Sequence, residues 1–203
     1  VPMAVRMIQM LSMGHHLQKN ISEGQLFGLE HIYEHYLSDG AAGRMQAYLK
    51  DRWEKPGSRY HVMKEMFACL HKLEVLSADW PKKVRHYEKV LFGGGRKQYE
   101  ALHQYRMPDK IAEQLLSYFI YVYFAGAVYD GMPYSKVKLA VISTMLIEDM
   151  VCAKAAEKGQ LSFEAIADAV HSYAREVEHS DLNLQRLSIM FRHQKCFHIG
   201  RLC

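Results

Sequence analysis

Several residue types in this sequence could take part in binding or proton chemistry. Of these, tyrosines are the most concentrated in one stretch. They lie within 17 residues, at Tyr118, Tyr121, Tyr123, Tyr129 and Tyr134. A tyrosine ring attracts a cation through its π face, and its hydroxyl can accept a proton or a hydrogen bond. Rings of this kind could wall a binding channel. The alternative is that they are core aromatics whose hydroxyls are satisfied by neighbouring groups.

A second set of polar residues forms a stripe on a helix predicted to follow Ser162. The stripe consists of Glu164, Asp168, His171, Arg175 and Glu178. Apolar residues occupy the opposite face, so the predicted helix is amphipathic. Such a stripe is typical of a solvated face, and its spacing alone does not indicate a site. An ion pair between Arg175 and Glu178 is one structural interpretation of the end of this stripe.

The histidines and cysteines do not form a pattern that predicts a metal site. Adjacent His15 and His16 would point about 100° apart on a helix. His31 and His35 have a chelating i,i+4 spacing, but they lack an HExxH pattern and nearby acidic ligands. No zinc motif fits the residues of the C-terminal tail, His193, Cys196, His198 and Cys203. We therefore predict no bound metal.

Phosphate-binding and hydrolytic motifs are not recognisable either. The triplet Gly93–Gly95 ends a predicted helix and lacks a following GK[ST], which indicates a helix stop rather than a phosphate loop. No Ser/His/Asp, paired-carboxylate or Walker arrangement is evident. The net charge is +4 with an isoelectric point near 8.8, and no run of five like charges occurs. We therefore predict no binding to nucleic acid.

The elements that would position these residues are all predicted to be helices. The most apolar stretch is Leu115–Tyr129, LLSYFIYVYFAGAVY, in which Ser117 is the only residue that is not apolar, aromatic or glycine. It is shorter than the roughly 18 apolar residues of a membrane span, and we expect it to be covered on every side. A turn at 130–133 then leads to a second apolar helix. We predict an all-α bundle built around a buried central helical hairpin, about 111–129 and 135–157.

Length and composition are those of one globular domain. The chain has 203 residues, of which 49% are hydrophobic and 24% charged. Its four cysteines are far apart and no signal peptide is recognisable, so we expect a reducing, cytoplasmic environment. The sequence starts at Val1-Pro2 and enters a helical pattern almost at once. We therefore expect residues 1–203 to be a single all-α domain cut from a longer protein.

Two segments resemble the C-terminal half of the flagellin lysine-N-methylase family. One is the hairpin sequence FAGAVYDGMPYSKVKLAVISTMLIEDM, which ends at Met150. In that family an aromatic segment likewise enters a VYDG-type turn and a YSKV helix start. The other is SYAREVEHSDLNL from Ser172, which is similar to the family's YSREIEHS-like helix. The N-terminal stretch AVRMIQMLSMGHHLQ…LFGLEHI is more loosely similar to the family's middle region.

The resemblance implies a cytoplasmic enzyme that transfers methyl groups from S-adenosylmethionine to lysine ε-amines of flagellin. It also implies an N-terminal cysteine cluster that holds an iron–sulfur centre, and this sequence contains no such cluster. We therefore expect the chain to be the C-terminal, substrate-recognition or scaffold domain of such an enzyme. Alone it would be inactive and would hold no cofactor.

The resemblance also selects candidate site residues. Glu178 and His179 match the family's EHS motif and are the candidate catalytic pair. The candidate substrate-binding residues are Tyr118, Tyr121, Tyr129 and Tyr134. An alternative from another functional class is a non-enzymatic all-α ligand-binding or interaction domain, such as the effector domain of a regulator. That alternative predicts an upstream helix-turn-helix module where the methylase predicts a cysteine cluster.

Overall fold

The computed structural model describes residues 2–50 and 58–193, and every regular element within these ranges is a helix. The α-helices are α1 (Met3–Ser22), α2 (Leu29–Leu37), α3 (Ala41–Lys50), α4 (Ser58–Leu70), α5 (Trp80–Phe92), α6 (Gly95–Leu102), α7 (Asp109–Phe124), α8 (Ala127–Asp130), α9 (Pro133–Lys158), α10 (Phe163–Tyr173) and α11 (Asp181–His193). Two 3₁₀ helices, η1 (Leu26–Gly28) and η2 (His103–Tyr105), and a π-helix, η3 (Ala174–Glu178), complete the set. The all-α prediction is confirmed. Cys196, His198 and Cys203 lie outside the described residues.

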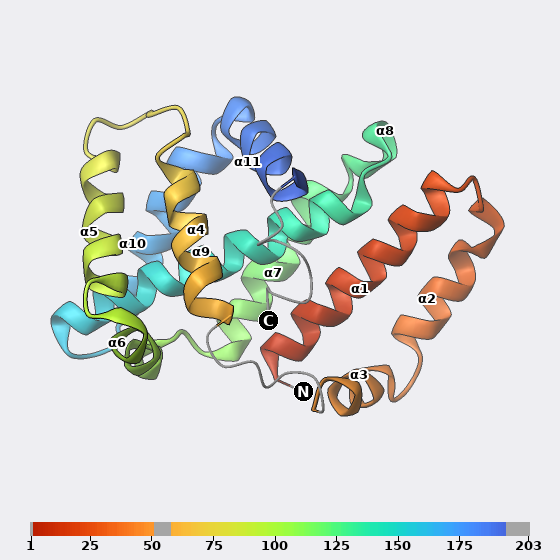
Figure 1. Cartoon of the computed structure of the whole chain (residues 1–203), viewed down its shortest axis with the longest axis horizontal. Helices are drawn as coiled ribbons and strands as arrows, with labels where there is room; N and C mark the ends of the chain where they lie inside the picture. Colours follow the sequence, from red (N-terminus) through yellow and green to blue (C-terminus); the bar gives the residue numbers. More distant parts are fainter. Residues whose placement is uncertain (1, 51–57, 194–203) are drawn as a thin grey trace.

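The centre of the molecule is α9. It is the longest of the described helices, and nearly all of its residues from Val137 to Ala155 are buried. Figure 1 shows it passing through the middle of the molecule, and α1, α7, α10 and α11 all pack along it. Buried apolar residues lie on every face of it, which is the pattern expected of a helix that is covered on all sides, although Glu148 and Asp149 are buried as well. Even so, no helix in the described parts of the chain has both the length and the apolarity required to cross a membrane.

The predicted hairpin forms, but the burial predicted for Leu115–Tyr129 is wrong. Only one stripe of α7 is buried, at positions 112, 116, 119 and 123, a helical i, i+4, i+7, i+11 spacing that faces α9. The helix ends at Phe124, and the short α8 follows. Tyr121 is 84% exposed and Tyr129 is 93% exposed. The apolar composition of this segment therefore does not make it the central helix of the bundle. The central, buried helix is its partner α9.

The turn between α7 and α9 is fixed by local hydrogen bonds. Gly131 has φ of 64°, a left-handed conformation that favours glycine. The Asp130 carboxylate accepts a hydrogen bond from the Met132 amide at 2.9 Å, and Pro133 begins α9. Gln18 of α1 donates to the Gly131 carbonyl at 2.9 Å. The YDGMP sequence thus produces the turn that it predicts, and α1 anchors it.

A buried ionic network joins α4, α6 and η2 to the centre of α9. Arg59 Nη2 lies 2.6 Å from Glu148 and 3.1 Å from Asp149, and the Tyr99 hydroxyl donates to Asp149 at 2.9 Å. His103 Nε2 is 3.6 Å from the same carboxylate. Burial alone would raise the pKa of Asp149, but Arg59, His103 and Tyr99 together hold it below its usual value. This charge is therefore compensated, as a charge inside a helical core must be.

Candidate functional site

The structure brings together two of the predicted site residues, Tyr118 on α7 and Glu178 at the end of η3. Their side chains lie close enough for each to shift the pKa of the other. Burial raises the pKa of Glu178, and the Tyr118 hydroxyl and nearby His179 oppose that rise. Burial and the Glu178 charge raise the pKa of Tyr118, so its phenol stays protonated. The pair is a carboxylate and a phenol that meet at the edge of the core.

Two more tyrosines surround Glu178 on the inner side. Tyr173 is fully buried, and its hydroxyl lies 2.7 Å from Ser143 Oγ. The Tyr123 hydroxyl is buried and makes no hydrogen bond of normal geometry, although Ser143 lies close enough to moderate its pKa. Burial raises the pKa of both phenols, and the Glu178 carboxylate contributes to each rise. We call these five residues, Tyr118, Tyr123, Ser143, Tyr173 and Glu178, the Glu178 cluster.

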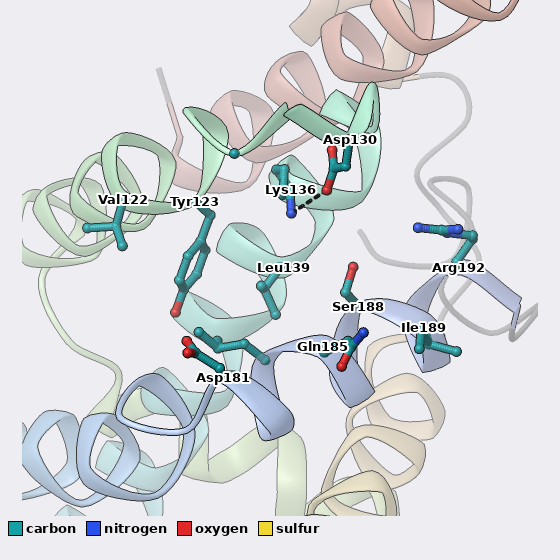
Figure 2. A pocket seen from close by; sticks show the side chains of 12 residues that line it. Val122, Tyr123, Asp130, Lys136, Leu139, Asp181, Gln185, Ser188, Ile189 and Arg192 are labelled. Atoms are coloured by element: carbon teal, nitrogen blue, oxygen red, sulfur yellow. Dashed lines mark ion pairs between the residues drawn. The ribbon is translucent and has the colours of Figure 1, made fainter. Parts of the chain in front are cut away.

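A cavity of about 540 Å³ adjoins this cluster. Tyr123 belongs to both, because its side chain also lines the cavity. Figure 2 shows Val122 and Tyr123 on one wall and the side chains of α11 on the facing wall. The full lining consists of Val122, Tyr123, Gly126, Asp130, Lys136, Leu139, Asp181, Leu184, Gln185, Ser188, Ile189 and Arg192. The cavity is therefore bounded by α7, the α7–α8 turn, α8, α9 and α11.

Charged groups of both signs line the cavity. Lys136 Nζ and Asp130 Oδ2 form an ion pair at 2.7 Å, which Figure 2 marks with a dashed line. Burial would raise the pKa of Asp130, but Lys136, the Met132 amide and the Arg192 charge lower it, so this carboxylate remains ionised. Asp181 and Arg192 lie on α11 on the other side of the space. A ligand that carries both an apolar stem and a charged group would find matching surfaces here.

The π-helix η3 sets the direction in which Glu178 points. The His179 amide donates to the Ala174 carbonyl at 3.1 Å, an i to i−5 bond that adds one residue to the turn. Within this turn Glu176 is fully buried, whereas Glu178 faces the tyrosines of α7. Single π-turns occur frequently at functional sites, where they redirect a side chain.

Glu176 and Asn183 hold the loop between α4 and α5 against this turn. Glu176 Oε2 accepts hydrogen bonds from the amides of Leu76 at 3.1 Å and Ser77 at 3.2 Å. Asn183 exchanges bonds with the backbone of Glu74, at 2.7 and 2.9 Å, and donates to the Glu176 carbonyl at 2.7 Å. We call this set the Glu176–Asn183 clamp. These hydrogen bonds could not be predicted from the sequence. Only the motif REVEHSDLN as a whole drew attention to this region.

The other residues at the end of η3 are placed differently. His179 is exposed and approaches Glu178 closely enough to influence its pKa. The alternative ion pair between Arg175 and Glu178 is not the arrangement found, because Arg175 lies 3.5 Å from both Asp79 and Glu176. Arg175 therefore does not form the ion pair with Glu178, and the neighbours of Glu178 are tyrosines.

The remaining predicted substrate tyrosines do not join the Glu178 cluster. Tyr121 and Tyr129 are almost fully exposed on α7 and α8. Tyr134 is half-buried against α1, where its ring packs edge-on to His15 at 5.3 Å and lies 4.6 Å from the Lys138 ammonium. Of the four tyrosines predicted to bind substrate, the structure brings Tyr118 alone to Glu178.

The chemistry available in the Glu178 cluster is that of binding and deprotonating an organic cation. A carboxylate flanked by aromatic rings attracts an ammonium group by charge and through the π faces. A carboxylate with a raised pKa is also a better proton acceptor than an exposed one. Within residues 2–50 and 58–193, no three His, Cys, Asp or Glu side chains are grouped so that they could hold a metal ion.

Comparison with known families gives a match over the whole chain. A model described as the FliB lysine N-methylase C-terminal domain matches residues 1–203. Comparisons with curated proteins and with solved structures gave no match. The resemblance inferred from two segments of the sequence is thereby confirmed for the full length of the chain.

Proposed function

The chain belongs to the FliB lysine N-methylase C-terminal domain family, and we propose that its Glu178 cluster receives the lysine side chain that the enzyme methylates. The substrate is flagellin, and the methyl donor is S-adenosylmethionine. The domain works in the cytoplasm as part of a longer protein and is inactive alone. Its described residues form helices and contain no strand–glycine turn–helix unit of the usual nucleotide-binding kind, and the iron–sulfur centre belongs to the N-terminal region of that protein.

The observation that carries this proposal is the half-buried Glu178, which lies close enough to Tyr118 for each side chain to shift the pKa of the other, beside a cavity of about 540 Å³. A lysine side chain combines an apolar stem with a terminal ammonium group. The carboxylate pairs with the ammonium, and the tyrosine rings attract it through their π faces. Val122 and Leu139 offer apolar surface to the stem within the cavity.

The cluster also provides the proton transfer that methylation requires. When bound, the donor supplies an electrophilic methyl group on a sulfonium sulfur, and only a neutral amine can attack it. Glu178 takes a proton from the ε-ammonium, which frees the nitrogen lone pair. The neutral phenol of Tyr118 lies beside the carboxylate, where it can help to orient it toward the incoming nitrogen.

The test is methyl transfer from labelled donor to flagellin by the full enzyme that contains this domain. Glu178→Gln keeps the side-chain shape but cannot accept the proton, so kcat/KM should fall at least about tenfold, equivalent to about 1.4 kcal/mol. The matched control is Glu164→Gln, since Glu164 is a strongly exposed glutamate on α10. The isolated chain serves as the blank. Full activity of the Glu178→Gln enzyme would refute the assignment of the site.

A further inference from the structure

A separate cavity of about 480 Å³ lies between α1, α2 and α3. Figure 1 shows these three helices together at one end of the molecule. The polar residues that line the cavity are Ser12, His15, His16, His35, Tyr36 and Arg44. None of the described residues that line it carries a carboxylate. The cavity is therefore lined by groups that are cationic or neutral.

The charges acting on the cavity have one sign. Burial lowers the pKa of His16, and the charges of His15, His35 and Lys19 lower it further. Among the described residues, the charged neighbours that act on this imidazole are thus cations of α1 and α2, and Arg44 of α3 also lines the cavity. Each of these positive charges opposes protonation of His16.

Two nearby carboxylates are paired with other cations. Glu23 lies 4.0 Å from Lys19 at the end of α1, and Glu34 lies 3.4 Å from His31 on the exposed side of α2. The Arg44 guanidinium donates to the backbone carbonyls of Asp39 at 3.2 Å and His35 at 3.3 Å. Among the described residues that line the cavity, none therefore supplies a carboxylate to neutralise its positive charge.

The donors of the cavity are held in place by neighbouring groups. The Tyr36 hydroxyl lies 2.9 Å from His16 Nδ1, and burial raises the pKa of Tyr36, so the phenol is neutral. When this phenol donates to Nδ1, the neutral imidazole carries its proton on Nε2, where it can donate to a ligand. Arg44 is fixed at 2.8 Å from Ser38 Oγ, and Arg44 and Ala41 place the first turn of α3 at the cavity. A helix N-terminus carries partial positive charge and unpaired amides.

We propose that the cavity lined by His15, His16, His35 and Arg44 is a binding site for a small oxyanion of the phosphate class. A tetrahedral dianion accepts hydrogen bonds from several directions, which suits donors that converge from three helices. A metal ion does not suit the same residues, because no three potential ligands in the described part of the chain are grouped to hold one. The site is independent of the Glu178 cluster, so either proposal can fail without the other.

The experiment is a titration of the purified chain with inorganic phosphate, followed by the side-chain NMR signals of its histidines. Chloride keeps the ionic strength constant, because surface charges respond to salt alone. We expect saturable shifts of the His16 and His35 signals, because both side chains line the cavity. Bound phosphate should also raise the pKa of His16, since an anion favours its charged form. A parallel titration with methyl phosphate distinguishes free phosphate from a phosphorylated ligand: binding by either supports the site, and binding by neither refutes it.

Two variants localise the effect. His16→Gln and Arg44→Gln should each weaken phosphate binding about tenfold, whereas Arg85→Gln, which removes an exposed arginine on α5, should leave it unchanged. Far-UV circular dichroism shows whether each variant is folded, and the titration of the unmodified chain decides the question if Arg44→Gln unfolds the α2–α3 turn. Shifts that do not saturate, that chloride reproduces, or that survive His16→Gln would overturn the proposal.

Discussion

Glu176 and Glu178 lie two residues apart on the same π-turn, yet their environments differ. Glu176 is fully buried, and one of its oxygens accepts hydrogen bonds from two loop amides. Glu178 is half-buried and meets tyrosines beside a cavity, with a raised pKa. A carboxylate whose bonds go to the backbone stabilises the fold, whereas a partly desolvated carboxylate with few partners is available for chemistry. The clamp and the cluster are thus expected to respond oppositely to substitution.

The largest expected effect is on stability, at the Glu176–Asn183 clamp. Asn183→Ala removes three hydrogen bonds and leaves the backbone groups of Glu74 and the buried Glu176 carbonyl with fewer partners. We expect the free energy of unfolding to fall by about 3 kcal/mol. Urea denaturation measures it, with Gln46→Ala on the exposed face of α3 as the control. A loss below about 0.5 kcal/mol, the range of ordinary surface substitutions, would mean that the clamp is not structural.

Glu178→Gln is expected to leave stability intact while it removes activity. Because the folded state raises the pKa of Glu178, the ionised form is disfavoured by folding at neutral pH, and its neutral replacement should not be less stable. We expect the unfolding free energy at pH 7 to stay within about 0.5 kcal/mol of the original or to rise. The same denaturation experiment measures it. A clear destabilisation would show that Glu178, like Glu176, stabilises the fold, and would contradict the difference proposed between the two carboxylates.

The pH dependence of methylation sharpens the contrast further. Protonated Glu178 can neither pair with an ammonium nor accept its proton, so kcat/KM should fall as pH falls through the raised pKa of this group. This decrease in kcat/KM at low pH, the acidic limb of the pH profile, should be missing from the Glu178→Gln enzyme. A pH profile of kcat/KM for both enzymes provides the measurement. An unchanged acidic limb in the variant would assign the titration to another residue.

The smallest expected effect is at Tyr118. The Tyr118 hydroxyl opposes the rise in the pKa of Glu178, so Tyr118→Phe should move the acidic limb to higher pH and reduce activity a few-fold at neutral pH. Tyr121→Phe is the matched control, because Tyr121 is 84% exposed three residues further along α7. Equal effects of the two substitutions would show that the Tyr118 hydroxyl has no special role.

Much of the fold could be predicted from the helical periodicity of the sequence. Which of the two hairpin helices is the more deeply buried could not. The turn at 130–133, the start of α10 at Ser162 and the helix end at Gly93 follow from local chemistry, and the structure contains them. Which helix of the hairpin is central depends on the number of neighbours that cover it. The rings of Tyr121 and Tyr129 gave no local signal that they would face solvent.

Less of the candidate site could be predicted. The motif around Glu178 drew attention to the correct turn, but a helical wheel with 3.6 residues per turn does not anticipate a π-turn, which separates the roles of Glu176 and Glu178. Glu178 and Tyr118 are 60 residues apart in the sequence, and only the folded structure shows that they lie close together. The bond between Tyr173 and Ser143 likewise joins two helices and required the structure.

The most direct test of the lysine site is the pKa of Glu178 with and without a lysine-containing flagellin peptide. Carboxyl carbon NMR of the chain, with Glu178→Gln used for assignment, reports this value. A bound ammonium favours the ionised carboxylate, so the pKa of Glu178 should fall when the peptide binds, and a peptide with norleucine in place of lysine should not lower it. If the lysine peptide binds and the pKa of Glu178 does not change, Glu178 does not hold the substrate amine.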